Sequence, residues 1–207
     1  MAFRSPKAPS DRTGSAADWL VVGLGNPGEE YSGTRHNVGA EAVEFFARRH
    51  GARLKVSKER ARIAELRLDG QLVVLAIPTT FMNLSGESVR PLLKRYGLSD
   101  LARLVVVHDE LDLPCGRVRI KVGGGLAGHN GLKSIHSHVH KSDFSRVRIG
   151  IGRPTGQQDV ADFVLRRPGK AERLALDVAV AFAADSIDQI VHEGLERAMN
   201  AVNARSA

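Results

Sequence analysis

Hydrophobic positions divide the chain into short apolar runs and longer stretches with a helical period. Residues 19–24 and 104–108 are continuous apolar runs, which is typical of strands buried on both faces of a sheet. Residues 37–50 carry an apolar stripe with the period of a helix, and Gly51 follows as a stop signal. This part of the chain therefore predicts a buried strand, a helix and a second buried strand.

Between these elements lie a hairpin and another helix. Residues 61–68 and 71–77 flank Asp69-Gly70, the strongest short signal for a β-hairpin. A second helix is predicted over residues 83–96, with Asn83 or Ser85 as its cap and Gly97 after its end. Pro91 lies inside that helix, where a kink is expected.

The C-terminal half of the chain continues the alternation of strands and helices. Residues 117–122 and 146–151 alternate basic and apolar positions, which predicts strands with one wet face. The glycine-rich segment 123–128 precedes a predicted helix over about 130–138. Residues 169–203 have a helical pattern that divides into two segments.

The order of these elements predicts an α/β fold: a single three-layer domain with a twisted mixed sheet flanked by helices, over residues 18–207. Residues 1–17 are rich in Ser, Pro, Gly and Ala, so we interpret them as a disordered tail. In such sheets the reactive groups gather at the carboxyl ends of the strands, where Asn26, Asn83 and Asp109 are expected.

Composition narrows the class of protein. The formal net charge is +7 and the sequence pI is about 10.0, which favours a polyanionic partner such as nucleic acid. Cys115 is the only cysteine, so neither a disulfide nor a cysteine-based metal site is expected, which fits a reducing compartment such as the cytoplasm. The chain shows no membrane-spanning run and no signal peptide, so no membrane partner is expected.

Two glycine-rich segments resemble nucleotide-binding loops, but each lacks part of the pattern. G-L-G-N-P-G at 23–28 matches the dinucleotide fingerprint, yet the first convincing helix starts about eight residues late, and no acidic residue falls at the required place. In the segment 123–134, Leu132 separates Gly131 from Lys133, which breaks the P-loop pattern. No nucleotide cofactor is therefore expected.

Several polar residues could carry chemistry. His36 follows the first strand, and histidine is the usual general base near neutral pH. Asp109 follows a buried strand, where its carboxylate could orient an imidazole. Glu110 and Asp112 could instead hold magnesium or be structural. No metal site is expected at the triplet that contains His136, His138 and His140, because residues two apart diverge on a helix.

Asparagines at three junctions form a second candidate set. Asn26, Asn83 and Asn130 each lie between a strand or helix and a loop. Asparagine is also a good turn and cap residue, so each one alone has a structural interpretation. All three beside a histidine and an aspartate would form a pocket lined by amides, suited to binding carbonyl groups.

These motifs resemble those of bacterial-type peptidyl-tRNA hydrolase. The similar blocks are GLGNPGEEYSGTRHNVG at 23–39, PTTFMNLSG at 78–86, HDELDLPCGRVRIKVGGGLAGHNGLKS at 108–134 and FSRVRIGIGRP at 144–154. The resemblance begins near Trp19 and reaches the C-terminal helices; residues 52–70 and the last 20 are only loosely similar. It implies an enzyme that cleaves the ester between a peptide and the 3′ end of tRNA.

The resemblance also implies roles for individual residues. His36 would be the general base that activates water, and Asp109 would hold its imidazole in the productive tautomer. The three asparagines would bind the peptidyl group, the developing oxyanion and the water. Tyr31 and Met82 would line the cleft around the tRNA end, and the terminal 5′ phosphate would be gripped by Lys121 and Arg148.

Neither a metal nor a cofactor is required for such a reaction, and a monomer is expected. One alternative is a non-catalytic RNA-binding module of the splicing type on the same scaffold. Such a module should expose an apolar patch for its partner. The C-terminal helices place charged residues among their apolar positions, among them Glu193, Glu196, Arg197 and Arg205, so no patch is expected there. The second alternative is a Rossmann-like dehydrogenase.

Overall fold

A single mixed sheet organises the part of the chain that the computed structural model describes, residues 16–154 and 156–205. Within those residues the sheet has seven strands in the order β2-β3-β4-β1-β5-β7-β6. Strands β4, β1, β5 and β7 are parallel, whereas β3 and β6 run antiparallel to their neighbours. The strands are β1 Trp19–Gly23, β2 Lys55–Ser57, β3 Ala61–Leu68, β4 Gln71–Pro78, β5 Leu104–Glu110, β6 Val118–Val122 and β7 Ser145–Gly150.

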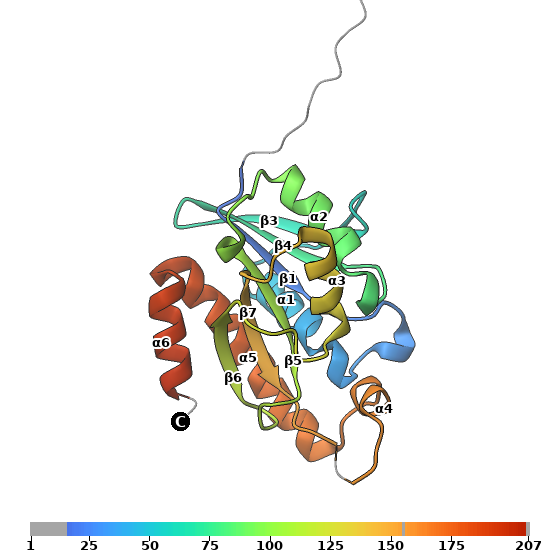
Figure 1. Cartoon of the computed structure of the whole chain (residues 1–207). Helices are drawn as coiled ribbons and strands as arrows, with labels where there is room; N and C mark the ends of the chain where they lie inside the picture. Colours follow the sequence, from blue (N-terminus) through green and yellow to red (C-terminus); the bar gives the residue numbers. More distant parts are fainter. Residues whose placement is uncertain (1–15, 155, 206–207) are drawn as a thin grey trace, which may run out of the picture.

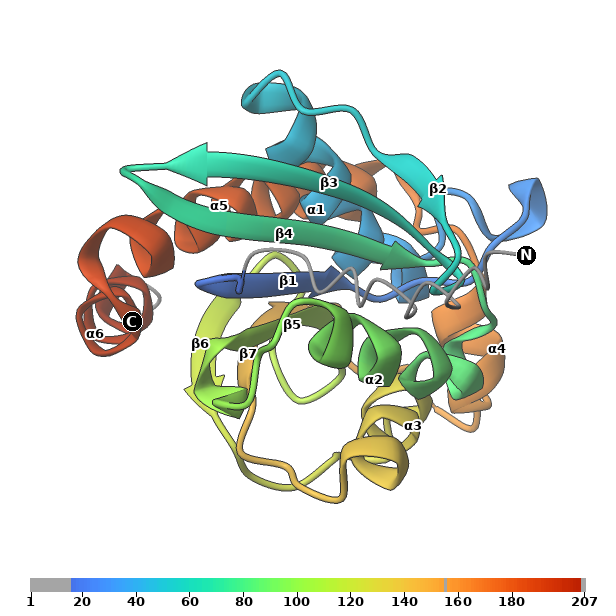
Figure 2. The same ribbon diagram turned by 90° about the horizontal axis from the view of Figure 1, so that it is seen from above.

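Helices cover both faces of the sheet and give three layers (Figures 1 and 2). Helices α1 and α5 lie on one face, and α2 and α3 lie on the other. The helices are α1 Val38–Arg49, α2 Gly86–Arg95, α3 Asn130–Val139, α4 Val160–Leu165, α5 Lys170–Glu193 and α6 Leu195–Arg205. Single 3₁₀ turns are η1 Glu29–Tyr31, η2 Arg35–Asn37, η3 Met82–Leu84 and η4 Leu101–Arg103. The predicted three-layer α/β fold is confirmed.

The two faces of the sheet explain the continuous apolar runs. In β1, Val21 packs in the cluster with α1 and α5, whereas Leu20 and Val22 pack in the cluster with α2 and α3. All three side chains are fully buried. Because both faces of this central strand are covered, polar residues have no exposed position in it.

The predicted hairpin and helices are confirmed, with small differences. Leu68 pairs with Gln71, so Asp69 and Gly70 form a two-residue turn with φ values of 47° and 79°. Positive φ at both positions is the requirement of a type I′ turn. Pro91 lies inside α2, which continues to Arg95.

Three features differ from the sequence prediction. The central strand β5 continues through Glu110, so Asp109 lies in it and not after it. The three-residue edge strand β2 and the six-residue helix α4 were not predicted. Both are too short for a hydrophobic period to appear, although Asp159 is a good cap and accepts bonds from the first backbone N–H groups of α4.

The first glycine-rich segment forms a close turn between strand and helix. Gly28 has φ 107° and leads into η1, and α1 begins only at Val38. Helix α1 approaches the sheet so closely that a Cβ on Gly39 would lie 2.2 Å from the Val107 carbonyl oxygen. Only glycine fits at position 39. The loop between β1 and α1 places Asn26 at the carboxyl edge of the sheet.

Helix α6 protects the edge strand β6. The Asn203 side chain accepts from the Ile120 N–H and donates to the Ile120 carbonyl, both at 2.9 Å. These two bonds satisfy the outward-facing backbone groups of the edge in place of a further strand.

The predicted tail falls mainly on residues 1–15, which lie outside the described part of the chain. Within the described part, the Ala17 N–H already donates to the Tyr96 carbonyl at 3.0 Å. Of the helices in residues 16–154 and 156–205, none is long and apolar enough to cross a membrane.

Candidate active site

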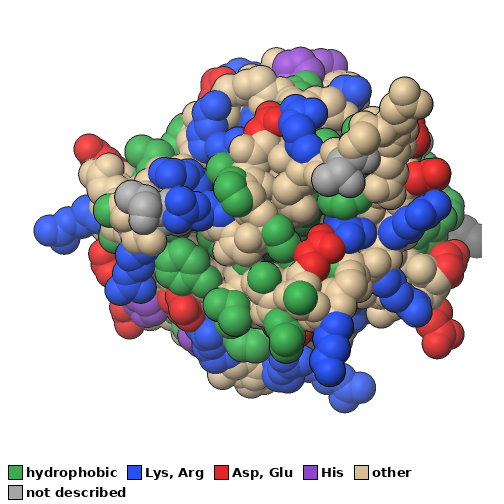
Figure 3. Space-filling view, turned by 90° about the horizontal axis from the view of Figure 1, so that it is seen from below, with side chains coloured by type: hydrophobic (Ala, Val, Ile, Leu, Met, Phe, Trp, Pro, Cys, Tyr) green, Lys and Arg blue, Asp and Glu red, His purple; other side chains and the backbone are tan. Residues whose placement is uncertain are grey.

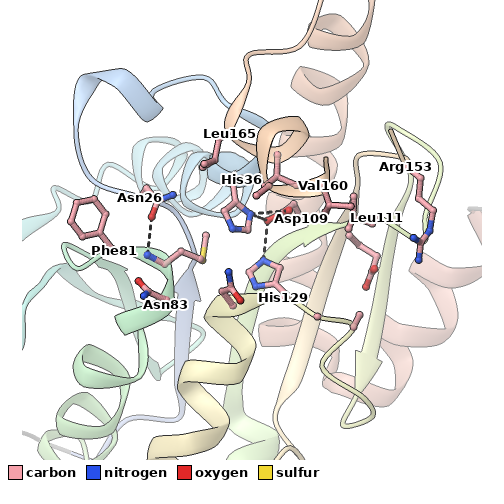
Figure 4. Close-up of a pocket in the computed structure, with 17 residues that line it drawn as sticks. Asn26, His36, Phe81, Asn83, Asp109, Leu111, His129, Arg153, Val160 and Leu165 are labelled. Carbon is pink, nitrogen blue, oxygen red and sulfur yellow. Dashed lines mark hydrogen bonds and ion pairs between the residues drawn. The ribbon is translucent and has the colours of Figure 1, made fainter. Parts of the chain in front are cut away.

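A cavity of about 620 Å³ opens at the carboxyl ends of the parallel strands (Figure 4). Seen from this side, hydrophobic side chains gather on a face bordered by lysines and arginines (Figure 3). The cavity is lined by Asn26, His36, Phe81, Met82, Asn83, Asp109, Glu110, Leu111, Ala127, Gly128, His129, Asn130, Arg153, Val160, Ala161, Val164 and Leu165.

His36 and Asp109 meet in the wall of this cavity. Turn η2 supplies His36, which is 8% exposed, and β5 supplies Asp109, which is 3% exposed. Nδ1 of His36 lies 2.9 Å and 3.0 Å from the two carboxylate oxygens of Asp109. Since an ionised carboxylate only accepts, Nδ1 carries the proton. Nε2 of His36 has no hydrogen-bond partner among the described residues and is left to accept a proton from the cavity.

The two groups shift each other's pKa. Burial alone would lower the pKa of His36, but the charge of Asp109 and its hydrogen bond outweigh burial and raise that pKa above 6.5. Burial would raise the pKa of Asp109, but His36 and His129 hold it well below its usual range. Asp109 is therefore ionised near neutral pH and favours the protonated form of His36.

His129 is a member of the site that sequence reasoning missed. Its Nε2 lies 3.0 Å from Oδ1 of Asp109, and its Nδ1 accepts from the backbone N–H groups of Gly131 and Leu132. These bonds fix the neutral tautomer with the proton on Nε2. The signal in the sequence was its position: His129 directly precedes the predicted helix, where a cap is needed.

A third histidine supports the site from inside the sheet. His108 is buried, and burial lowers its pKa to about 3, so it is neutral. Its Nδ1–H donates to the backbone carbonyl of Asp109 at 2.7 Å, and its ring meets that of His129 edge-on. His108 therefore packs behind Asp109 and does not line the cavity.

Asn26 is held rigidly by its neighbours. Asn37, a second residue that sequence reasoning missed, accepts from the Asn26 N–H at 2.8 Å and donates to the Asn26 carbonyl at 2.9 Å. The side-chain Oδ1 of Asn26 accepts from the Met82 N–H at 2.8 Å. With its oxygen engaged, Asn26 is left with Nδ2 as a donor, and this amide has no partner among the described residues.

The other two predicted asparagines reach the same cavity. Turn η3 supplies Asn83, and Asn130 is the first residue of α3. Both are exposed, and their side-chain amides make no hydrogen bond with the described residues. The structure thus brings His36, Asp109 and all three asparagines together, and two amides can both donate and accept.

The apolar part of the lining differs from the prediction for Tyr31. Met82 lines the cavity and is 4% exposed. Tyr31 lies outside the described lining and packs edge-on against Phe81, with ring centroids 6.3 Å apart. Phe81 lines the cavity in its place and is 52% exposed. Helix α4 supplies four further lining residues, which sequence reasoning did not include.

The predicted phosphate contacts lie on β6 and β7. Lys121 pairs in register with Arg146, and Arg148 lies two residues further along β7, so all three share one face of the sheet. Lys121 is exposed. Arg148 is partly buried and donates from Nε to Glu110 at 2.9 Å. Arg146 is only 3% exposed, which the alternating pattern did not predict.

The carboxylates of Glu110 and Asp112 are occupied by arginines, which argues against the magnesium alternative. Glu110 is paired with Arg148, and Asp112 accepts from Arg153 on the rim of the cavity. Each carboxylate therefore already has a cationic partner.

The donor atoms of His36, Asp109 and His129 lie within 4.8 Å of one another, close enough to hold a metal ion. A cation between them would have to displace the proton on Nδ1 of His36 and the proton on Nε2 of His129. Both protons already bind Asp109, so the arrangement fits a hydrogen-bonded set better than a metal centre. In the other candidate cluster, His138 binds the Ser134 carbonyl and His140 adopts a left-handed conformation after α3.

Comparisons with known proteins converge on one family. The family model described as peptidyl-tRNA hydrolase matches residues 20–207. The chain is 51% identical over 186 residues to a protein of Frankia alni named peptidyl-tRNA hydrolase, covering 90% of this chain and 94% of that protein. A protein of Cutibacterium acnes with the same name is 46% identical over 197 residues, covering 90% and 98%.

A solved structure agrees with these relatives. The crystal structure of peptidyl-tRNA hydrolase from Acinetobacter baumannii superposes on this chain with a TM-score of 0.85 at 40% sequence identity. The match covers 92% of this chain and 98% of the other. The likeness therefore extends over the whole sheet and the helices on both of its faces.

Proposed function

The chain belongs to the peptidyl-tRNA hydrolase family and hydrolyses the ester between the peptide and the 3′ end of peptidyl-tRNA, and we propose that His36 is the general base of this reaction. The observation that carries the proposal is the orientation of its imidazole. Asp109 holds Nδ1–H at 2.9 Å and leaves Nε2 facing a cavity lined by amides. Free tRNA is released for reuse in translation.

In the proposed mechanism, a water molecule bound near Nε2 of His36 attacks the ester carbonyl. Nε2 takes a proton from the water as the new C–O bond forms, and the imidazolium is stabilised by the ionised Asp109. The negative charge that develops on the carbonyl oxygen is bound by amide N–H donors. The tetrahedral intermediate then collapses, and His36 returns the proton to the departing 3′ oxygen of the tRNA.

The asparagines divide the remaining work. Asn26 offers only Nδ2, because its oxygen is tied to the Met82 N–H, so we assign it to the carbonyl oxygen or the developing oxyanion. Asn83 and Asn130 keep both amide atoms free and can read a peptide group, which has a donor and an acceptor. A substrate with a free amino group lacks that peptide unit, so this arrangement favours peptidyl-tRNA over aminoacyl-tRNA.

The tRNA end is proposed to bind along β6 and β7. Lys121 is exposed on this face, and we assign it and Arg148 to the terminal 5′ phosphate. Arg148 is held by Glu110, which orients its guanidinium but also neutralises part of its charge. Lys121 is therefore expected to provide the stronger attraction for the phosphate.

We further propose that residues 18–207 act as one catalytic domain and as a monomer in the cytoplasm, where translation supplies the substrate. The comparisons do not support the alternative of a non-catalytic splicing-type module. Two apolar side chains on α5, Leu174 and Val178, are 61% and 71% exposed, which the sequence did not predict. They lie one helical turn apart, and a pair of this size is common on protein surfaces.

Hydrolysis of N-acetyl-aminoacyl-tRNA tests the assignment of His36. We expect release of tRNA by the wild-type chain and a loss of about 10²–10⁴-fold in kcat for His36→Ala, the range for removal of a general base. His50→Ala is the matched control, because His50 forms its hydrogen bond with Asp188 away from the cavity. Full activity of His36→Ala would refute the proposal.

A further inference from the structure

Arg35 directly precedes His36 on η2, but its side chain contacts the start of α5 and the end of α4. Its Nε and Nη2 each lie 2.5 Å from one carboxylate oxygen of Glu172, in the first turn of α5. Its Nη1 donates to the backbone carbonyls of Phe163 and Arg166, at 3.2 Å and 3.0 Å. The guanidinium also lies 4.2 Å from the centre of the Phe163 ring.

These contacts are made by a buried group. The Arg35 side chain is 9% exposed and that of Glu172 is 26% exposed. All three guanidinium nitrogens are used, and the planar fork matches the carboxylate with two parallel bonds. A lysine could not reproduce this pattern, because an ammonium group is a compact donor without the fork.

The segment that Arg35 holds forms one wall of the cavity. Phe163 lies in the last turn of α4 and Arg166 is the residue that caps it, with its N–H bound to the Phe163 carbonyl. The carbonyls at such a helix end need further partners from outside the helix. Four residues of α4 line the cavity and give it an apolar side, namely Val160, Ala161, Val164 and Leu165. Figure 4 shows Val160 and Leu165 on the same side of the cavity as His36. The position of this wall relative to His36 therefore depends on Arg35.

A second arginine makes the reverse connection. Arg167 follows α4 and donates to the carbonyls of Ser32 and Glu29, at 2.8 Å and 3.2 Å. Those two carbonyls belong to η1 and the residue after it. Arg35 thus satisfies carbonyls at the end of α4, and Arg167, which follows α4, satisfies carbonyls in the segment before η2. The Arg35 N–H adds a backbone bond to the Arg166 carbonyl at 3.4 Å.

We propose that Arg35 is a positioning residue, which fixes the apolar wall of α4 relative to His36 so that this wall binds the side chain next to the scissile ester. The inference rests on the proposed function, because it assigns the α4 wall to the peptide part of peptidyl-tRNA. The proposal also predicts substrate specificity: the α4 wall should distinguish substrates by the apolar area of the side chain next to the ester.

Kinetics of Arg35→Lys test the proposal with the same tRNA charged with N-acetylphenylalanine or N-acetylglycine. We expect KM for the phenylalanine substrate to rise about tenfold, the scale of a partly lost apolar contact, with KM for the glycine substrate within about twofold. Both kcat values and the acid limb of the pH profile should be unchanged. Equal losses with both substrates, or a fall in kcat alone, would overturn the proposal.

Hydrogen exchange of the same variant provides a readout that does not depend on catalysis. Amides of α4 should exchange about tenfold faster in Arg35→Lys, whereas those of α1 and β5 should keep wild-type rates. Unchanged exchange in α4 contradicts the positioning role, and so does faster exchange without the split in KM. If His36→Ala keeps full activity, the proposed function fails on its own, and the exchange result still reports on Arg35.

Two further variants keep the test decisive. If Arg35→Lys does not fold, Glu172→Gln can be used in its place. This variant removes the charged partner of Arg35 and leaves its bonds to the two carbonyls. We expect the same rise in KM and the same faster exchange of α4, both smaller than in Arg35→Lys. Arg49→Lys is the matched control, because Arg49 pairs with Asp185 on the exposed surface. Wild-type exchange and KM values for Glu172→Gln would overturn the proposal.

Discussion

Two loops each bring a histidine to the Asp109 carboxylate, but the two imidazoles bind it through different ring nitrogens. Turn η2 presents His36 through Nδ1, whereas the glycine-rich loop before α3 presents His129 through Nε2. The second nitrogen of His36 has no partner among the described residues, whereas that of His129 accepts from two backbone N–H groups of α3. Chemical type and distance to Asp109 therefore do not distinguish the two histidines.

We infer from this difference that the second ring nitrogen of each histidine decides its role in the site. A general base needs a lone pair that is open to the water, and only His36 has one in this arrangement. His129 uses its lone pair as the cap of α3 and its proton to stabilise the Asp109 carboxylate. This contrast supports our proposal that His36 is the general base and that His129 holds its partner Asp109.

The largest effect is expected when the shared carboxylate loses its charge. Asp109→Asn should lower kcat by about 10²–10⁴-fold, because the imidazole is no longer held in the productive tautomer. The charge of Asp109 raises the pKa of His36, so its removal should move the acid limb of kcat/KM to lower pH. The pH profile of the residual activity measures this shift; a limb that moves upward would contradict the assignment.

Removal of the second histidine should have the opposite effect on pH dependence. His129→Ala should lower kcat about tenfold, the value of one hydrogen bond to a charged group, and leave His36 as the only imidazole donor to Asp109. The pKa of His36 should then rise, and the acid limb should move to higher pH. His129→Asn keeps a good cap for α3 but is too short to reach Asp109, so it separates capping from catalysis.

This contrast also shows the limit of sequence reasoning. Strands, helices and the hairpin turn could be predicted, because hydrophobic spacing and the Asp69-Gly70 pair are local signals. His36 and Asp109 could be predicted as a pair, because each lies at the end of a strand or the start of a helix. His129 was missed because its bond to Asp109 depends on how α3 packs against β5.

Contacts that arise only in the folded chain also explain why the roles of Arg35 and Asn37 were not predicted. Arg35 binds Glu172, which is 137 residues away, and no local pattern indicates that contact. Asn37 was read only as the start of a helix, yet it fixes both backbone groups of Asn26. Tyr31 was expected in the cleft from the resemblance alone; in the structure it contacts Phe81, which lines the cavity, and is not itself among the lining residues.

A smaller effect on activity is expected when the loop after β1, which carries Asn26, loses its hydrogen bonds to Asn37. Asn37→Ala removes two bonds to the backbone of Asn26 and should cost about 1–2 kcal/mol in the free energy of unfolding. KM should rise about tenfold, because Asn26 no longer presents Nδ2 in a fixed direction. Gln71→Ala is the matched control, since it removes two hydrogen bonds, from Trp19 and to the Val191 carbonyl, at the start of β4 and should leave KM unchanged.

The smallest effect on KM is expected for Lys121, which lies beside the glycine-rich loop that leads to His129. Lys121 passes next to Gly124 in this loop, and its loss should remove one phosphate contact. Lys121→Ala should raise KM several-fold at low salt and reduce the slope of log KM against log salt by about 1. Lys58→Ala, near β2 at the opposite edge of the sheet, should keep the wild-type slope.

The central claim is that His36 carries its proton on Nδ1 and keeps Nε2 free. Titration of the chain labelled with ¹⁵N-histidine tests it most directly, because the two ring nitrogens have distinct shifts. We predict a neutral form protonated at Nδ1 and a pKa above 6.5 that coincides with the acid limb of kcat/KM. A neutral form protonated at Nε2, or a titration that does not match the acid limb, would contradict the account.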